Sequence, residues 1–122
     1  MKSYGIRGAA SIEGDSVDQV DAAVSKLIDE ILKKNGLTEA DLVSILFTCT
    51  NDIHSVFPAT SARKFGLKNT PLICAVEMEV PGSLPLIIRA LVTCQKEGNF
   101  IPTHIYLGRA KALRPDLSIN ES

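Results

Sequence analysis

The sequence contains no tryptophan, only six other aromatic residues, two histidines and three cysteines among its 122 residues. Cys49, Cys74 and Cys94 are odd in number, widely spaced and set in apolar runs, which is typical of reduced thiols rather than of a disulfide framework. His54 and His104 have no companions at ligand-like spacing. Phosphate-cradling glycine loops and serine-type triads are also missing. We therefore expect neither a metal nor a cofactor.

The sequence also lacks an excess of either charge and any long hydrophobic run. Thirteen basic and fourteen acidic residues give a net charge of -1, so no global field would hold nucleic acid or an anionic membrane surface. No stretch approaches the roughly 18 apolar residues of a membrane span, and the N-terminus has no signal-peptide core. We expect a cytoplasmic protein with one domain over residues 1–117 and a polar tail over 118–122.

The chain does contain a regular succession of strand and helix patterns. Apolar residues recur at helical spacing over 16–34, with Ser16 and Gln19 matching a capping box and Gly36 marking the end. Pro58 opens a second, short helical turn. Apolar and β-branched runs predict strands at 4–12, 42–50, 72–80, 87–94 and 103–107. Residues 87–94 also fit a helix.

This order of elements predicts an α/β (α+β) sandwich, in which one sheet of about five strands packs on one long helix. A single long helix cannot cover both faces of a sheet. The uncovered face therefore predicts self-association, for which a closed cyclic oligomer is the usual solution.

Charged residues in apolar company are the strongest indication of a site. Glu77 is an acid inside an apolar strand pattern, and spacing does not separate it from Glu79, which would share its face. Arginine binds planar carboxylates through paired hydrogen bonds, so several converging arginines indicate a small polyanion. The equally weighted alternative is an internal Arg89–Glu77 salt bridge with the other arginines on the surface. The arginines in question are Arg7, Arg63, Arg89 and Arg114.

Six short segments together resemble the AroH-type chorismate mutases, the small, monofunctional, trimeric form first known from Bacillus. The resemblance runs almost from end to end. The matching segments are GIRGA at 5–9, HSVFPA at 54–59 with Arg63 after it, C-x-x-E at 74–77, IR at 88–89, HIYL at 104–107 and LRPDL at 113–117.

The resemblance implies an isomerase that converts chorismate to prephenate by an intramolecular Claisen rearrangement, in the biosynthesis of phenylalanine and tyrosine. It also implies a mixed sheet and a homotrimer that forms a pseudo-barrel. Each active site would be built from two neighbouring chains, without a cofactor. Such a trimer would cover the exposed sheet face.

The resemblance further implies roles for individual residues. Arg7 would bind a substrate carboxylate with help from the Tyr106 hydroxyl, and Arg89 would face the ether oxygen of the breaking bond. Glu77, rather than Glu79, would accept a hydrogen bond from the ring hydroxyl, with the backbone at Cys74 nearby. Arg114 would close over the pocket with a mobile C-terminal segment. The other residues expected to line the pocket are Phe57, Ala59, Thr60, Arg63, Ile73 and Leu113.

Some features leave alternatives open. Thr60 stands where some members carry a lysine, and Ile73 where a threonine can occur, which would affect substrate affinity. Strict alternation puts Cys74 and Glu77 on opposite faces, unless a bulge or strand end lies near position 75. A RidA-like imine deaminase and a regulatory module that binds an aromatic-pathway metabolite are the competing functions.

Overall fold

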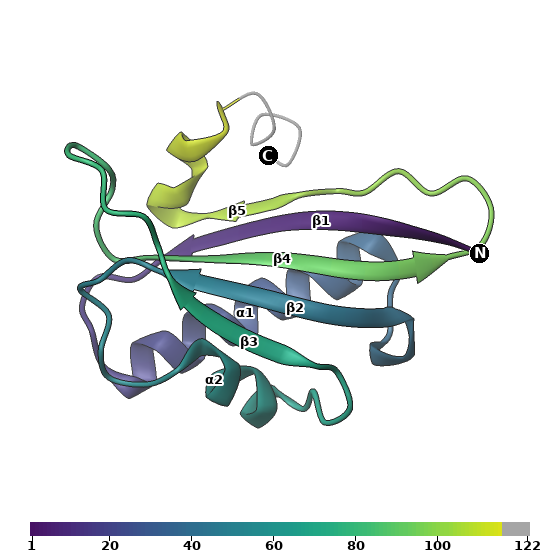
Figure 1. Ribbon diagram of the computed structural model, residues 1–122, viewed down its shortest axis with the longest axis horizontal. Coiled ribbons are helices and arrows are strands. Elements are labelled where there is room, and N and C mark those ends of the chain that lie inside the picture. Colours follow the sequence, from purple (N-terminus) through teal and green to yellow (C-terminus); the bar gives the residue numbers. More distant parts are fainter. Residues whose placement is uncertain (116–122) are drawn as a thin grey trace.

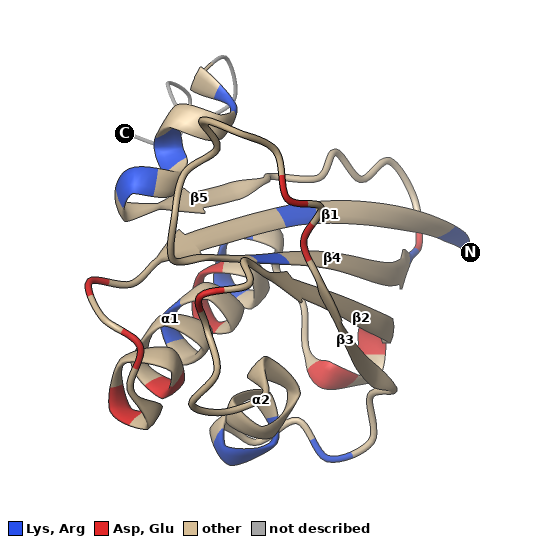
Figure 2. Cartoon of the chain, turned by 60° about the vertical axis from the view of Figure 1, so that its left-hand side comes forward, with Lys and Arg blue, Asp and Glu red and all other residues tan. Residues whose placement is uncertain are grey.

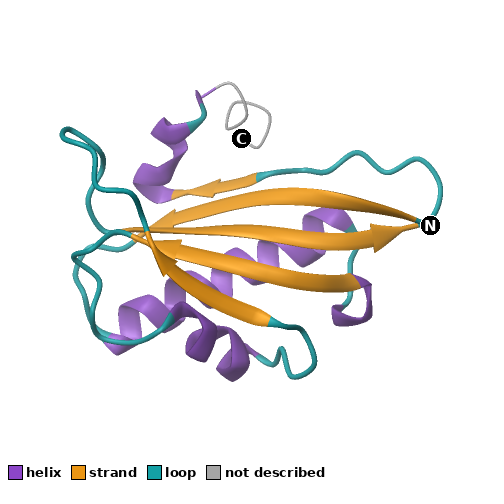
Figure 3. Ribbon diagram, viewed as in Figure 1, coloured by secondary structure: helices purple, strands orange, loops and turns teal. Residues whose placement is uncertain are grey.

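The computed structural model describes residues 1–115, and Figure 3 shows its strands and helices. The polar tail expected at 118–122 lies outside the described residues. The elements are β1 (Lys2–Ser11), α1 (Val17–Asn35), the 3-10 turn η1 (Glu39–Asp41), β2 (Leu42–Cys49), α2 (Pro58–Phe65), β3 (Leu72–Val76), β4 (Ile87–Lys96), β5 (Ile105–Leu107) and the 3-10 turn η2 (Gly108–Leu113).

The strands form one mixed five-stranded sheet with the order β3-β2-β4-β1-β5 (Figure 1). The central strand β4 is antiparallel to both β1 and β2. The outer strands β5 and β3 run parallel to β1 and β2, respectively. The two parallel pairs, β3–β2 and β1–β5, therefore meet at β4, in agreement with the expected single sheet.

The long helix follows the sequence pattern closely. Ser16 caps it, because the Ser16 hydroxyl accepts a 3.2 Å hydrogen bond from the Gln19 N–H. The expected reciprocal capping box is wrong, however, because the Gln19 side chain accepts from the N–H groups of Glu13 and Gly14 instead. Gly36 ends the helix in the left-handed conformation with φ 61°, which glycine adopts without a Cβ clash.

The strand expected over 72–80 is too long, since β3 ends at Val76. Its neighbour β2 ends at Cys49, and a 2.8 Å bond from the Glu77 N–H to the Cys49 carbonyl continues the pairing by one residue. A strand needs a hydrogen-bonding partner, so the chain leaves the sheet there. The strand expected over 103–107 is likewise shorter, and the 3-10 turn η2 after it was not predicted.

Both helices pack on the same face of the sheet, as the ribbon in Figure 1 shows for α1. Phe47 and Ile6 are fully buried beneath α1, and the backbone of β1 lies close to the helix at Gly8. A Cβ at Gly8 would lie 2.9 Å from the Ile31 Cδ1 atom. The opposite face, which we call the open face, carries exposed Leu46 and Leu91.

Candidate active site

Arg7 and Arg89 lie on the open face, on the adjacent strands β1 and β4. Arg89 pairs with Ala9, two residues beyond Arg7, so alternation points both side chains away from α1. Tyr106 on β5 pairs with the same Ala9 and shares this face. Together with Glu77 and Thr48, these side chains line a cavity of about 250 Å³.

Glu77 contacts Arg89 directly. Its Oε1 atom lies 3.5 Å from the Arg89 Nε atom, and its Oε2 atom accepts a 3.2 Å hydrogen bond from the Thr48 hydroxyl. Figure 2 shows the acidic positions after β3 close to the basic positions on β1 and β4. The side chains of Arg89 and Glu77 are 48% and 25% exposed, so this ion pair is worth at most about 1 kcal/mol.

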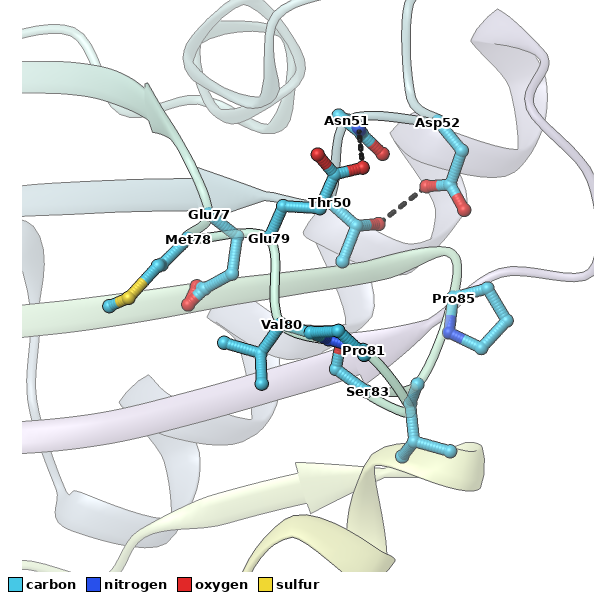
Figure 4. A pocket seen from close by; sticks show the side chains of 11 residues that line it. Thr50, Asn51, Asp52, Glu77, Met78, Glu79, Val80, Pro81, Ser83 and Pro85 are labelled. Carbon is cyan, nitrogen blue, oxygen red and sulfur yellow. Dashed lines mark hydrogen bonds between the residues drawn. The ribbon is translucent and has the colours of Figure 1, made fainter.

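Glu79 points elsewhere, although the sequence pattern put it on the same face as Glu77. Its carboxylate accepts a 2.7 Å hydrogen bond from the Asn51 amide, and Figure 4 shows the two carboxylates pointing away from each other. The reason is that the pairing of β3 with β2 ends at the Glu77 N–H, so the alternation of a strand no longer applies beyond Glu77. Geometry therefore separates two acids that spacing did not.

The C-terminal part of the described chain closes one side of this site. Tyr106 is buried against Ala9 and Ala110, and Leu113 packs on the same cluster. Leu113 also lines a cavity of about 280 Å³ together with Glu77 and Arg89. Arg114 belongs to the same region, because its charge acts on His104, which bonds to Arg7. We call the six predicted residues of this region the Arg7 group: Arg7, Glu77, Arg89, Tyr106, Leu113 and Arg114.

The other predicted residues gather at a different edge of the molecule, around β3 and α2. Phe57, directly before α2, is 70% exposed and lines a cavity of about 680 Å³ with Cys74. Arg63 donates a 3.4 Å hydrogen bond to the Thr60 hydroxyl within α2. We call these residues the Phe57 group: Phe57, Ala59, Thr60, Arg63, Ile73 and Cys74.

The Cys74 side chain faces α2, where its Sγ atom accepts a 3.4 Å hydrogen bond from the Ala59 N–H. Glu77 faces the other side of the sheet, so alternation holds from 74 to 77 and the described pairing has no bulge near position 75. Ile73 also faces the open side and is 64% exposed. Only the Cys74 backbone can therefore contribute to a site on the open face.

His104 was not assigned a role from the sequence, although it belongs to the HIYL segment and directly precedes β5. The Arg7 N–H donates a 2.9 Å hydrogen bond to the His104 Nδ1 atom. Partial burial lowers the pKa of this imidazole, and the guanidinium groups of Arg7 and Arg114 lower it further. The ring is therefore neutral near pH 7.

Within residues 1–115, no three His, Cys, Asp or Glu side chains converge as metal ligands. In the same range, no helix is both long enough and apolar enough to cross a membrane. Burial raises the pKa of the Cys49 and Cys94 thiols, which disfavours the nucleophilic thiolate form. The site offers instead cationic donors, one carboxylate and a phenol.

The pattern of chorismate mutase type I matches residues 3–117. The chain belongs to this family. The chorismate mutase AroH of Thermus thermophilus is 40% identical over 115 residues, covering 93% of this chain and 94% of that protein. The chorismate mutase AroH of Bacillus subtilis is 35% identical over 127 residues, covering 100% of this chain and 98% of that protein.

The fold agrees with this membership. A solved chorismate mutase from Clostridium thermocellum superimposes with a TM-score of 0.84 at 38% identity, covering 89% of this chain and 98% of that one. The expected mixed sheet on one long helix is thereby confirmed. As a type I chorismate mutase, the protein is an isomerase of aromatic amino acid biosynthesis that converts chorismate to prephenate.

Proposed function

We propose that the Arg7 group of one chain and the Phe57 group of a neighbouring chain together form the chorismate site, within a homotrimer in the cytoplasm. The observation that carries this proposal is the convergence of Arg7, Arg89 and Glu77 on the open face. In one chain this convergence forms only half of an enclosed site. A second copy supplies the apolar wall.

Exposed apolar side chains support the assembly. Phe57 and Ile73, on the β3–α2 edge, are 70% and 64% exposed, and Leu46 and Leu91 are exposed on the open face. Covering such surface releases about 25 cal/mol for each Å² of apolar area removed from water. A cyclic arrangement, in which the edge of each copy covers the open face of the next, buries both surfaces and completes three equal sites.

The reaction sets two physical tasks, neither of which needs proton transfer or a covalent intermediate. The substrate must be held in a compact reactive conformer. Arg7 and the Tyr106 hydroxyl would hold one carboxylate, and Glu77 would accept from the ring hydroxyl. Leu113 and Phe57 would enclose the substrate.

The second task is to stabilise the negative charge that grows on the ether oxygen as the C–O bond breaks. Arg89 would do this. Because Glu77 contacts Nε, the terminal nitrogens of the Arg89 guanidinium can donate into the cavity. A preorganised donor of this kind is worth roughly 3–4 kcal/mol. A comparable contribution from conformer restriction brings the total to about 8 kcal/mol, the lower end of enzymatic rate acceleration.

The remaining residues complete the proposal. Arg63 of the neighbouring chain would offer positive charge to the second carboxylate, next to Thr60 and Ala59, with the Cys74 backbone near the ring hydroxyl. Arg114 and the chain after it would close the site. That closing segment lies mostly outside the described residues, so its mobility stays a prediction.

Replacing Arg89 by citrulline, its neutral isostere, tests the proposal. Semisynthesis is practical because ligation at Cys74 leaves one 74–122 fragment that contains Arg89. We expect kcat to fall at least roughly a hundredfold, the effect of one lost transition-state donor. The assay follows the loss of chorismate absorbance and converts the product to phenylpyruvate with acid.

The matched control is citrulline at Arg109, in the same fragment. Arg109 donates to the Pro85 and Ile12 carbonyls, at 3.2 and 2.8 Å, and lies outside both site groups. We expect its kcat to equal that of the wild type. A citrulline 89 protein with full kcat and only a raised KM would refute the role of Arg89.

A further inference from the structure

His104 makes two contacts with Arg7 that cannot both be hydrogen bonds. The Arg7 backbone N–H donates to Nδ1 at 2.9 Å, and the Arg7 Nη1 atom lies 3.3 Å from Nε2. A neutral imidazole has one acceptor nitrogen, and arginine only donates. Since the backbone bond is the shorter one and its donor direction is set by β1, Nδ1 is the acceptor. The proton of the neutral ring is therefore on Nε2.

This assignment leaves two donors facing the same space. The Nε2–H group of His104 and the Nη1 group of Arg7 lie side by side, and within residues 1–115 no acceptor bonds to either of them. Two adjacent donors repel each other unless a shared acceptor lies next to both. A carboxylate oxygen has two lone pairs and can accept from both groups at once.

The position of the His104 ring is fixed by hydrogen bonds to the backbone beside it. The buried Asn35 side chain binds the backbone of the preceding residue at both polar atoms, accepting from the Thr103 N–H at 2.7 Å and donating to the Thr103 carbonyl at 3.0 Å. Asn35 is the last residue of α1. The imidazole is thus fixed between the end of α1 and the backbone of β1, which preorganises its free N–H group.

We propose that the His104 Nε2–H group is a direct donor to the substrate carboxylate that Arg7 binds. This inference rests on the proposed chorismate site and adds to it a substrate-binding residue to which the sequence analysis gave no role. The neutral ring suits the role, because its Nδ1 keeps the Arg7 backbone bond while its Nε2–H donates to the anion. Arg7 and Arg114 supply the positive charge around it.

Two substitutions separate the donor role from the structural one. His104→Asn keeps an acceptor near the Nδ1 position for the Arg7 N–H but removes the distal donor. His104→Gln places an amide N–H near the Nε2 position but removes the proximal acceptor. We expect the asparagine variant to raise the KM for chorismate about tenfold, the effect of one charge-assisted hydrogen bond, with kcat within about twofold and stability unchanged.

The glutamine variant should show the opposite pattern, with KM within about threefold of wild type and a lower unfolding midpoint in urea. If His104 only supported the backbone of Arg7, KM would rise with the loss of stability, so the glutamine variant would have the higher KM. That result, or an unchanged KM in the asparagine variant, would overturn the proposal.

Nitrogen NMR on the wild-type protein tests the same point without a substitution. With two histidines in the chain, the His104 signals are assigned by their loss in either variant. We expect the Nε2–H form in the free protein and a downfield shift of that proton when prephenate, the product dianion, is added. An Nδ1–H form, or a His104 signal that prephenate does not move, would refute the proposal.

The outcomes also separate this proposal from the one it rests on. If the wild-type protein turns over chorismate and the Arg89 citrulline protein loses kcat while His104 signals stay unmoved, only the His104 proposal fails. If prephenate does not bind and chorismate is not turned over, both proposals fail.

Discussion

Replacing Gly8 by alanine tests how closely β1 packs on α1, directly beside Arg7. A Cβ built at Gly8 lies 2.9 Å from the Ile31 Cδ1 atom and 3.1 Å from the Leu27 Cδ1 atom. Both side chains are buried, with exposures of 2% and 0%, so neither has free space to move into. The alanine methyl group therefore overpacks the interface between sheet and helix.

The magnitude follows from two opposing terms. Overpacking a well-packed core costs about 1–3 kcal/mol, whereas Gly→Ala recovers about 0.4–1 kcal/mol by restricting the unfolded chain. We expect Gly8→Ala to lower the free energy of unfolding by about 1–2 kcal/mol. At about 4 °C per kcal/mol for a chain of this length, Tm falls by roughly 4–8 °C.

Gly5 provides the matched control on the same strand. A Cβ there meets only the Leu91 Cδ1 atom, at the ordinary contact distance of 3.7 Å. Gly5→Ala should therefore leave stability unchanged or raise it slightly. Both variants are measured by urea unfolding at one fixed protein concentration, because association would otherwise contribute to the midpoint.

A double substitution tests the cause directly. Ile31→Val removes the Cδ1 atom that the new methyl group meets, and alone costs about 0.5–1.5 kcal/mol. In the Gly8→Ala background it should cost less than this, because it relieves the overlap. If Gly8→Ala is as stable as wild type, or if the two effects add without coupling, the packing argument is wrong.

Two further predictions concern single carboxylates. Glu77→Gln should lower kcat/KM about tenfold, because a charged acceptor binds more strongly than an amide. Glu79→Gln should leave the steady-state kinetics unchanged. Equal losses of kcat/KM in both variants would contradict the assignment of Glu77 to the site. Hydrogen bonds from the Asn69 N–H and from Thr70 lower the Glu39 pKa. Glu39→Gln should therefore destabilise the fold at pH 7 but not at low pH. If urea unfolding shows the same loss of unfolding free energy at every pH, this prediction is wrong.

The pH range in which Glu39 stabilises the fold follows from the direction of its pKa shift. A carboxyl whose pKa is lower in the folded state stabilises the fold fully above its ordinary unfolded pKa of about 4.3. This contribution decreases as the pH falls through that value toward the lowered folded pKa. The difference between wild type and variant should therefore narrow only below about pH 4.

The sequence alone was enough to predict the regular elements whose causes are local. The helix α1 begins after Ser16 and ends at Gly36, because a cap and a left-handed glycine act within a few residues of the chain they terminate. The apolar strands are likewise visible as short β-branched runs. The family segments also came from the sequence, and with them the activity.

The tertiary structure decided what depends on partners distant in the sequence. β3 ends at Val76 because β2 ends at Cys49. Glu77, the last residue bonded to β2, still contacts Arg89, whereas Glu79 beyond it bonds to Asn51. His104 meets Arg7 because β5 joins the sheet beside β1. Hydrogen-bond partners set where a strand stops and where a side chain points. The spacing of residues along one strand carries no information about the strand that pairs with it.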